Sequence, residues 1–308
     1  MKVFRSLDNL PLFRNAVVTL GTFDGVHAGH RILIESITAE AKRLGGESVL
    51  LTFDKHPRTV IRPDETEPKL LTTSDEKITL LESLGVDNLV VIPFTKEFSQ
   101  LSARDYVSDF LVKLFHPSVI VIGYNHRFGH HRDGSIELLQ KLAPENKFTV
   151  KEINKQLVND IAVSSTRIRV ALEEGDIATA NELLGYEYTL NGLVVKGDQR
   201  GRTIGFPTAN VKSSSEHKLV PARGVYITMT AVDGHEHRSM TNIGIRPTVG
   251  GTLEHVETHL IAYDGDLYGQ NVTLHFHKRL RDEQKFNGID ALKSQLEKDK
   301  EATERFFF

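Results

Sequence analysis

Cysteine is absent from the 308 residues of the sequence. Its absence excludes disulfides, thiolate zinc sites, iron–sulfur clusters and cysteine nucleophiles, and it leaves hydroxyl, carboxylate, imidazole and cationic groups for chemistry. An excess of positive charge is also absent, because 38 basic side chains stand against 41 acidic ones and the formal net charge is -3. This balance supplies no field for wrapping a polyanion, so we expect no generic binding of nucleic acid.

Long apolar runs are absent as well. No window reaches the ~18 apolar residues of a membrane span. The first residues carry Asp8 and Pro11 in place of the apolar core of a signal peptide. We therefore expect a cytoplasmic protein without a membrane partner, and the length suggests two domains at the usual ~150 residues each.

The first half of the sequence alternates short apolar runs with longer amphipathic segments. Capping patterns that begin at Thr73 and at Ser102 mark two helix starts. A periodic stretch predicts an earlier helix at 31–44. Strands are expected at 16–20, 48–53, 88–93 and 118–123. Strands that alternate with helices predict a parallel sheet covered on both faces.

The pattern changes near Gly185, where we place the boundary between a domain at 1–185 and a domain at 186–308. Two short helices are expected before this boundary, at 166–174 and 176–184. Strands then follow one another without intervening helices, at 190–196, 225–232, 238–243, 255–262 and 271–277. Consecutive short strands predict an antiparallel barrel. The buried side of a final helix is expected to carry Ile289, Leu292 and Leu296.

A glycine-rich run, GTFDGVHAGH at residues 21–30, lies between the first predicted strand and the first predicted helix. Its glycines permit close approach of the backbone to a phosphate, and the helix N-terminus adds amide donors and a positive dipole end. His27 and His30 can both face a phosphoryl oxygen. A tight turn with two exposed histidines is the plain alternative, and a zinc site is a further rival.

A second glycine-rich run, GDQRGRTIGFPTAN at residues 197–210, lies between two predicted strands. It cannot be a Walker loop, which needs a following helix and a Gly-Lys-Ser/Thr ending. Lys196, Arg200 and Arg202 add positive charge to it. Thr208 and Asn210 would point to the same side of a strand and could offer two neutral oxygens to Mg²⁺. The plain alternative is a hairpin turn followed by a polar strand.

The first run resembles the signature of the nucleotidyltransferase superfamily, in the form found in bacterial FAD synthetases. The segment VSSTRIR at 163–169 resembles a second element of that family. The segment GYNHRFG at 123–129 resembles a third but departs from it, with Asn125 in place of an aspartate and His126 in place of an aromatic residue. The resemblance implies that His27 and His30 hold the phosphates of ATP and stabilise the transition state at the α-phosphate.

The same resemblance implies the remaining contacts of this half. Those to ATP come from Gly21, Phe23, Asp24, Gly25, Gly29, Ser164, Ser165, Thr166 and Arg167. Those to the flavin come from Asn125 and Phe128. Without the family, the hydroxyls at 164–166 would be helix caps. His130 and His131 could be metal ligands with Asp133, or part of a solvated polar loop.

The second run resembles the riboflavin kinase signature, whose Pro-Thr-Ala-Asn segment binds ATP and magnesium. The resemblance implies that Glu257 is the general base for the riboflavin hydroxyl, and that Arg281 and Phe286 contact the flavin. ATP contacts are implied for Gly197, Gly201, Arg202, Gly205, Pro207, Thr208 and Asn210, and metal ligation for Thr208 and Asn210. Without the family, Glu257 would be a surface glutamate in a cross-strand pair.

Together the two resemblances imply an α/β, Rossmann-like nucleotidyltransferase domain followed by an antiparallel β-barrel riboflavin kinase domain with a C-terminal helix. Such a protein would convert riboflavin to FMN and FMN to FAD, with Mg²⁺ as cofactor and riboflavin, FMN and ATP as small-molecule partners. One alternative is a kinase whose N-terminal domain is weak or inactive, and another is a flavin- or nucleotide-responsive regulator without turnover. The sequence leaves the oligomeric state undefined.

Overall fold

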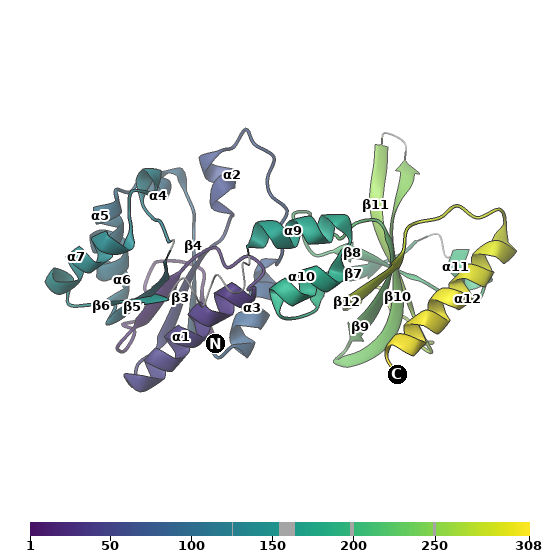
Figure 1. The fold of residues 1–308 in the computed structure, drawn as a ribbon, viewed down its shortest axis with the longest axis horizontal. Helices are drawn as coiled ribbons and strands as arrows, with labels where there is room; N and C mark the ends of the chain where they lie inside the picture. Colours follow the sequence, from purple (N-terminus) through teal and green to yellow (C-terminus); the bar gives the residue numbers. More distant parts are fainter. Residues whose placement is uncertain (125, 154–163, 198–199, 249–250) are drawn as a thin grey trace. The chain divides into compact units, whose positions relative to one another are not determined.

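The computed structural model describes residues 1–124, 126–153, 164–197, 200–248 and 251–308 (Figure 1). The chain divides into two compact units, residues 1–165 and residues 166–308. Each unit is built around its own sheet. Among the described residues, no helix is both long and apolar enough to cross a membrane.

The first unit contains a six-stranded sheet in the order β1-β4-β3-β2-β5-β6. All of its neighbouring strands pair in parallel. The strands are β1 (Lys2–Phe4), β2 (Val17–Leu20), β3 (Ser48–Phe53), β4 (Asn88–Ile92), β5 (Val119–Gly123) and β6 (Thr149–Ile153). The four predicted strands are confirmed. The two edge strands, β1 and β6, were not predicted, because they are short or polar and only partly buried.

Helices connect these strands (Figure 1). They are α1 (Ala28–Arg43), α2 (Pro57–Ile61), α3 (Ser74–Ser83), α4 (Lys96–Ser99), α5 (Ala103–Asp105), a π-helix (Tyr106–Val112), α6 (Lys113–Phe115), a 3-10 turn (His130–Arg132) and α7 (Ile136–Asn146). The predicted capping box of α3 is confirmed, because the Glu76 amide donates to Thr73 Oγ1 at 3.3 Å and the Thr73 amide donates to Glu76 Oε2 at 2.8 Å. Ser102 caps α5 in the predicted way, accepting from the Asp105 amide at 3.1 Å.

Apolar side chains cover both faces of the sheet. Val17 and Leu50 belong to one buried cluster, together with residues of α1 and α3. Their neighbours Val18 and Leu51 belong to the other cluster, together with residues of the π-helix and α7. This alternation is the period-2 pattern of a strand buried on both sides, and it confirms the predicted layering.

The second unit begins with the two predicted helices, α9 (Ser165–Glu174) and α10 (Ile177–Leu184). A closed antiparallel barrel follows, in the order β10-β11-β8-β7-β12-β9. Its elements are β7 (Tyr188–Val195), α11 (Arg200–Thr203), β8 (Ala209–Ser213), β9 (Gly224–Val232), β10 (His235–Thr248), β11 (Gly251–Leu260), β12 (Asn271–Arg281) and the terminal helix α12 (Ile289–Phe306). The predicted barrel and terminal helix are confirmed.

Hydrogen bonds attach α9 and α10 to the barrel. The Leu172 carbonyl accepts from the Ala222 amide at 2.8 Å. The side chain of Asn181 donates to the Phe276 carbonyl and accepts from the Tyr188 amide, both at 2.8 Å. The predicted domain limits, 1–185 and 186–308, remain a proposal about which parts act independently.

One residue of the predicted buried face of α12 is wrong. Ile289 is 65% exposed, whereas Asp299 and Thr303 are buried. The buried side of the helix also contains an ion pair, in which the Asp299 carboxylate accepts from the Arg281 guanidinium at 2.7 to 3.1 Å. Leu296 does pack against the buried side chains of the barrel, including Met240. The seam therefore combines one apolar contact with a buried ion pair, and the apolar period alone misplaces the first turn.

Candidate active sites

The loop between β2 and α1 has a strained backbone. Phe23 has φ +46° and Val26 has φ +38°, and Gly25 between them has φ +84°. A left-handed conformation is unusual for an aromatic residue and an outlier for a β-branched one, and each such residue costs about 1–3 kcal/mol. Strain of this size persists only where the surroundings hold the loop firmly, and it is characteristic of binding loops.

His27 and His30 meet at the start of α1. His27 is the N-cap residue, and its side chain accepts from the His30 amide at 3.4 Å. The two imidazole rings stack with their centroids 3.6 Å apart. Gly29 leaves room for this arrangement, since a Cβ atom there would lie 3.3 Å from the His27 ring. The predicted pair therefore forms two stacked imidazole rings at a helix N-terminus.

Both imidazoles are neutral at pH 7. Burial lowers the pKa of His27 to about 4. Burial also lowers the pKa of His30, and repulsion from His27, when that ring is protonated, and from Lys77 lowers it further. The buried Nδ1 atom of His30 has no hydrogen-bond partner in the described part of the chain. A buried nitrogen of this kind is available to a ligand.

A cavity of about 980 Å³ opens beside the two histidines. Residues that follow β2, β3, β4 and β5 line it, so it lies at the carboxyl edge of the sheet, where ligands bind in folds of this type. Its described lining residues include no aspartate and no glutamate. Its lysine and arginine residues are Arg58, Arg62, Lys96, Arg127 and Arg132. An anionic ligand with a flat apolar part suits such a cavity, because Phe and Tyr side chains line it as well.

Most of the predicted residues of this half reach the cavity. They are Gly21, Phe23, His27, Gly29, His30, Phe128, Ser164 and Ser165. Thr166 and Arg167 are exposed on α9 and are not among the lining residues. Asn125 lies outside the described residues. The roles assigned to these residues stay predictions.

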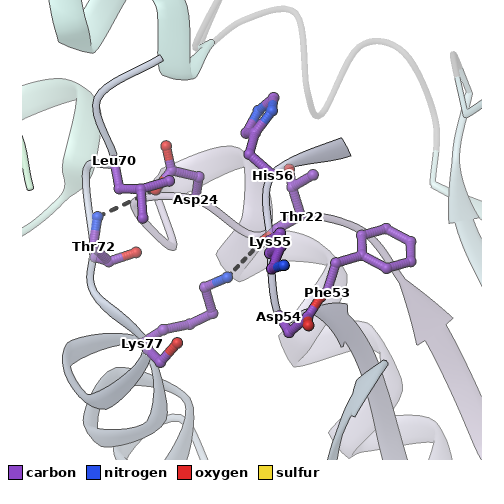
Figure 2. A pocket seen from close by; sticks show the side chains of 10 residues that line it. Thr22, Asp24, Phe53, Asp54, Lys55, His56, Leu70, Thr72 and Lys77 are labelled. Carbon is purple, nitrogen blue, oxygen red and sulfur yellow. Dashed lines mark hydrogen bonds between the residues drawn. The ribbon is translucent and has the colours of Figure 1, made fainter. Parts of the chain in front are cut away.

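Asp24 has a different environment from the other predicted residues (Figure 2). Its carboxylate accepts from the Leu71 amide at 2.9 Å and from the Thr72 amide at 3.2 Å. Asp24 lines a separate cavity of about 30 Å³ together with Lys77. The structure thus shows Asp24 joining the strained loop to the segment before α3.

His126 keeps a flat ring at the position where the family has an aromatic residue. Its imidazole stacks on Phe128 with centroids 6.0 Å apart, and Phe128 stacks on Tyr106 at 5.2 Å. Burial lowers the pKa of His126 to about 4, and Arg132 adds to the effect. The buried Nε2 atom of His126 has no hydrogen-bond partner among the described residues. The substitution therefore adds a neutral polar edge to an aromatic wall.

The sequence interpretation missed the basic residues of the cavity. Arg58 and Arg62 come from the segment after β3, and Arg132 comes from the loop after β5. Each is one charged residue in a polar stretch, so composition does not distinguish it from a solvated surface. Their position after parallel strands is the signal that could have identified them, because carboxyl ends of such strands meet at one edge.

On the barrel, the predicted base and one predicted metal ligand are neighbours. Glu257 of β11 pairs with Asn210 of β8 on one side and with Asn242 of β10 on the other. Directly paired residues lie on the same face of a sheet. The adjacent Thr258 is buried in the barrel and bonded to Thr241, so the alternation puts Glu257 on the outer face. The structure therefore brings Asn210, Glu257 and Asn242 side by side.

Each glycine of the second run occupies a position that disfavours a larger residue, for a different reason in each case. A Cβ atom at Gly197 would lie 2.1 Å from the Asn210 amide, and one at Gly201 would lie 2.2 Å from the Phe206 carbonyl. Gly205 has open space but φ +85°, a conformation that favours glycine. The short helix α11 forms inside this run, and His259 Nδ1 lies 2.7 Å from the Pro207 carbonyl. Gly197 therefore packs against Asn210, Gly201 packs against Phe206 of the same run, and Pro207 contacts β11 through His259.

Arg281 contacts two side chains of the second unit, Asp299 and Phe286. Its guanidinium bonds the Asp299 carboxylate, and its centre lies 5.7 Å from the Phe286 ring centroid. This cation–π contact and the ion pair together link the segment after β12 to α12. The flavin contacts assigned to Arg281 and Phe286 stay predictions.

Clusters that could hold a metal ion through three or more His, Asp or Glu side chains are not found within the described ranges. The rings of His130 and His131 are tilted at 43° with centroids 3.7 Å apart, and both residues line the large cavity. The oxygen atoms of Thr208 and Asn210 are the remaining metal ligands predicted from the sequence.

The comparisons with known proteins agree with this division of the chain. The family model for FAD synthetase matches residues 11–167, and the model for riboflavin kinase matches residues 184–307. A protein of Listeria monocytogenes named bifunctional riboflavin kinase/FMN adenylyltransferase is 38% identical over 95% of this chain and 93% of its own length. A protein of the same name from Escherichia coli K12 is 36% identical over 100% of this chain and 98% of its own length.

A solved structure shares the fold along its whole length. A crystal structure described as a macrolide-efflux protein from Streptococcus pneumoniae superposes with a TM-score of 0.86 at 29% identity, over 98% of both chains. We take only the shared architecture from this match. The description of that protein names macrolide efflux, whereas the two family models that match this chain are those of FAD synthetase and riboflavin kinase.

Proposed function

The chain belongs to the family of bifunctional riboflavin kinases/FMN adenylyltransferases, and on that premise we propose where each of its reactions takes place. It is a riboflavin kinase and an FMN adenylyltransferase, and its FAD synthetase part precedes its riboflavin kinase part. We propose that adenylyl transfer occurs in the cavity beside His27 and His30, and that phosphorylation occurs on the barrel face around Glu257.

The observation that supports the first assignment is the charge of the cavity. The protein as a whole carries a net charge of -3, yet the described lining residues of the cavity include five lysine and arginine side chains and no carboxylate. ATP and FMN are both anionic, so both are attracted to this cavity. Phe128 and Tyr106 offer stacked rings for the flat part of a substrate.

In adenylyl transfer, the FMN phosphate attacks the α-phosphorus of ATP, and the bond from that phosphorus to the leaving pyrophosphate breaks. FMN brings its own anionic nucleophile, so the reaction needs alignment and charge stabilisation more than a strong base. His27 and His30 are suited to this task at the helix N-terminus, where the backbone amides also point toward an anion. A polyphosphate that enters would favour the protonated form of either ring.

In the kinase reaction, the riboflavin 5′-hydroxyl attacks the γ-phosphorus of ATP, and the bond from that phosphorus to the leaving ADP breaks. Glu257 would accept the hydroxyl proton, and the loop at 197–208 would hold the phosphates through its amides and the charge of Arg202. The support for this assignment is the register, which makes Glu257 the direct neighbour of Asn210.

We propose Mg²⁺ as the cofactor of both steps, bound together with ATP. The donor set on the barrel fits it, because Thr208 and Asn210 are half-buried and offer a hydroxyl and an amide oxygen beside a carboxylate. Magnesium is commonly held by one or two protein groups and by the phosphates of the substrate, and it neutralises developing charge on phosphorus. Because both steps consume ATP, we propose that the enzyme acts in the cytoplasm.

The test is a chromatographic time course of riboflavin, FMN and FAD, with one reaction started from riboflavin and another from FMN. Glu257→Gln is expected to abolish phosphorylation of riboflavin and to leave conversion of added FMN within about twofold of the original protein. His30→Ala is expected to do the reverse. Equal loss of both activities in either variant, or retention of FAD formation in His30→Ala, would contradict the assignment.

A further inference from the structure

Lys77 of α3 lies directly beneath the strained loop of the first unit (Figure 2). Its ammonium group donates to the Thr22 carbonyl at 2.7 Å and to Thr52 Oγ1 at 3.3 Å. The Thr52 hydroxyl in turn donates to the same Thr22 carbonyl at 3.0 Å. The peptide that leads into Phe23 is therefore held by two donors, one of them charged.

The segment before α3 holds the next part of the loop. The Asp24 carboxylate accepts from the amides of Leu71 and Thr72, and the Gly25 amide donates to Thr72 Oγ1 at 3.0 Å. The α3 helix is itself anchored, through its capping box and through Leu81 in the core. A rigid element thus fixes the loop residue by residue, which explains how the left-handed Phe23 and Val26 persist.

We propose that Lys77 is a positioning residue for adenylyl transfer, which holds the loop at 22–26 so that His27 and His30 face the polyphosphate, and which adds a positive charge behind that loop. The proposal rests on the assignment of adenylyl transfer to this unit. Lys77 lines the small cavity and not the large one, and its ammonium group bonds the loop at the Thr22 carbonyl, so we assign it a role through the loop and not by contact with substrate.

The charged and titratable groups around Lys77 come from three elements. Asp24 belongs to the loop, His30 to α1, and Asp54, Lys55 and His56 to the end of β3 and the segment after it. Burial lowers the pKa of Lys77 to about 8, and the carboxylate of Asp24 opposes this shift. A neutral amine still has two N–H donors. A rise in pH through this range therefore removes the charge and leaves both hydrogen bonds in place.

The experiment measures kcat and KM for ATP in FAD formation from FMN, for Lys77→Met and Lys77→Arg. Lys42→Met is the matched control, because Lys42 is an exposed lysine of α1 in the same unit. Lys77→Met is expected to lower kcat/KM by about 10- to 100-fold, as expected for a displaced catalytic loop. Lys77→Arg should retain most of the activity, since the adjacent cavity of about 30 Å³ gives room for a guanidinium. FAD formation by Lys42→Met should stay within about twofold of the original protein. Riboflavin phosphorylation by every variant should also stay within about twofold.

The pH profile separates positioning with charge from a structural role. FAD formation by the original protein should decline as pH rises through about 8, and Lys77→Arg, whose charge does not titrate, should lack that decline. Activity of Lys77→Met within twofold of the original protein, or the same alkaline profile in the original protein and Lys77→Arg, would overturn the proposal. If Lys77→Met unfolds the first unit, the comparison with Lys77→Arg decides. His30→Ala in the same assay distinguishes the two hypotheses, because its full activity would refute the site itself.

Discussion

At the scale of single residues, the glycines of the second run show how close packing places a site. Gly197 faces the amide of Asn210, and Asn210 pairs with Glu257 across the strands. The absence of one Cβ atom thus sets the position of a side chain proposed to meet the metal and the phosphates. The four-residue spacing of the glycines is visible in the sequence. The contact or backbone conformation that favours glycine at each position is not.

Gly197→Ala is expected to displace the Asn210 side chain, because the new methyl group would lie 2.1 Å from its amide. Riboflavin phosphorylation should fall by at least about tenfold, while FAD formation from FMN should not change. Gly234→Ala is the matched comparison, since its φ is +80°, its Cβ meets open space and the cost is backbone strain of about 1–2 kcal/mol in the second unit. Initial rates of both reactions and thermal unfolding of each variant check the prediction. An unaffected kinase in Gly197→Ala would show that Asn210 does not need its observed position.

At the scale of elements, the contact between β12 and α12 depends on a buried ion pair. Asp299 is 4% exposed and accepts from Arg281 and from Gln295 Nε2. The same guanidinium lies against Phe286, in the segment that joins the two elements. The apolar pattern of α12 predicts a helix correctly, but it places Ile289 inside when the structure places it outside, and it contains no information on the ion pair at Asp299.

Asp299→Asn is expected to lower the free energy of unfolding of the second unit by about 2–3 kcal/mol, because the guanidinium loses its charged partner. The segment with Phe286 should become less ordered, and the KM for riboflavin should rise more than kcat falls. The measurement is thermal unfolding with and without riboflavin, since a bound ligand raises the transition of the unit that binds it. Glu301→Gln, an exposed change on the same helix, should have no effect on either quantity.

At the scale of the whole molecule, the two proposed sites lie in separate compact units. Each has its own sheet, and one family model ends at residue 167 while the other begins at residue 184. Two reactions in series then share one soluble intermediate, FMN, which both sites must recognise. A defect in one unit should leave the chemistry of the other intact.

An equimolar mixture of Glu257→Gln and His30→Ala is therefore expected to convert riboflavin to FAD, although neither variant does so alone. FMN made by the kinase of one molecule would be adenylylated by the other. The time course should show FMN accumulating before FAD, and the lag should shorten as protein concentration rises. If the mixture makes no FAD while each variant keeps its remaining activity, FMN must pass between units of the same molecule.

The sequence by itself determined the order of elements, the two classes of fold and the two glycine-rich runs, because periodicity, caps and glycine spacing are local properties of the chain. It also identified His27, His30, Asn210 and Glu257 as candidates. Only the tertiary structure decided the basic lining of the cavity, the edge strands, the ion pair under α12 and the position of Lys77 beneath the loop. These features join residues far apart in the sequence, as Lys77 and Thr22 are, and their energies come from burial and from contacts that no local pattern encodes.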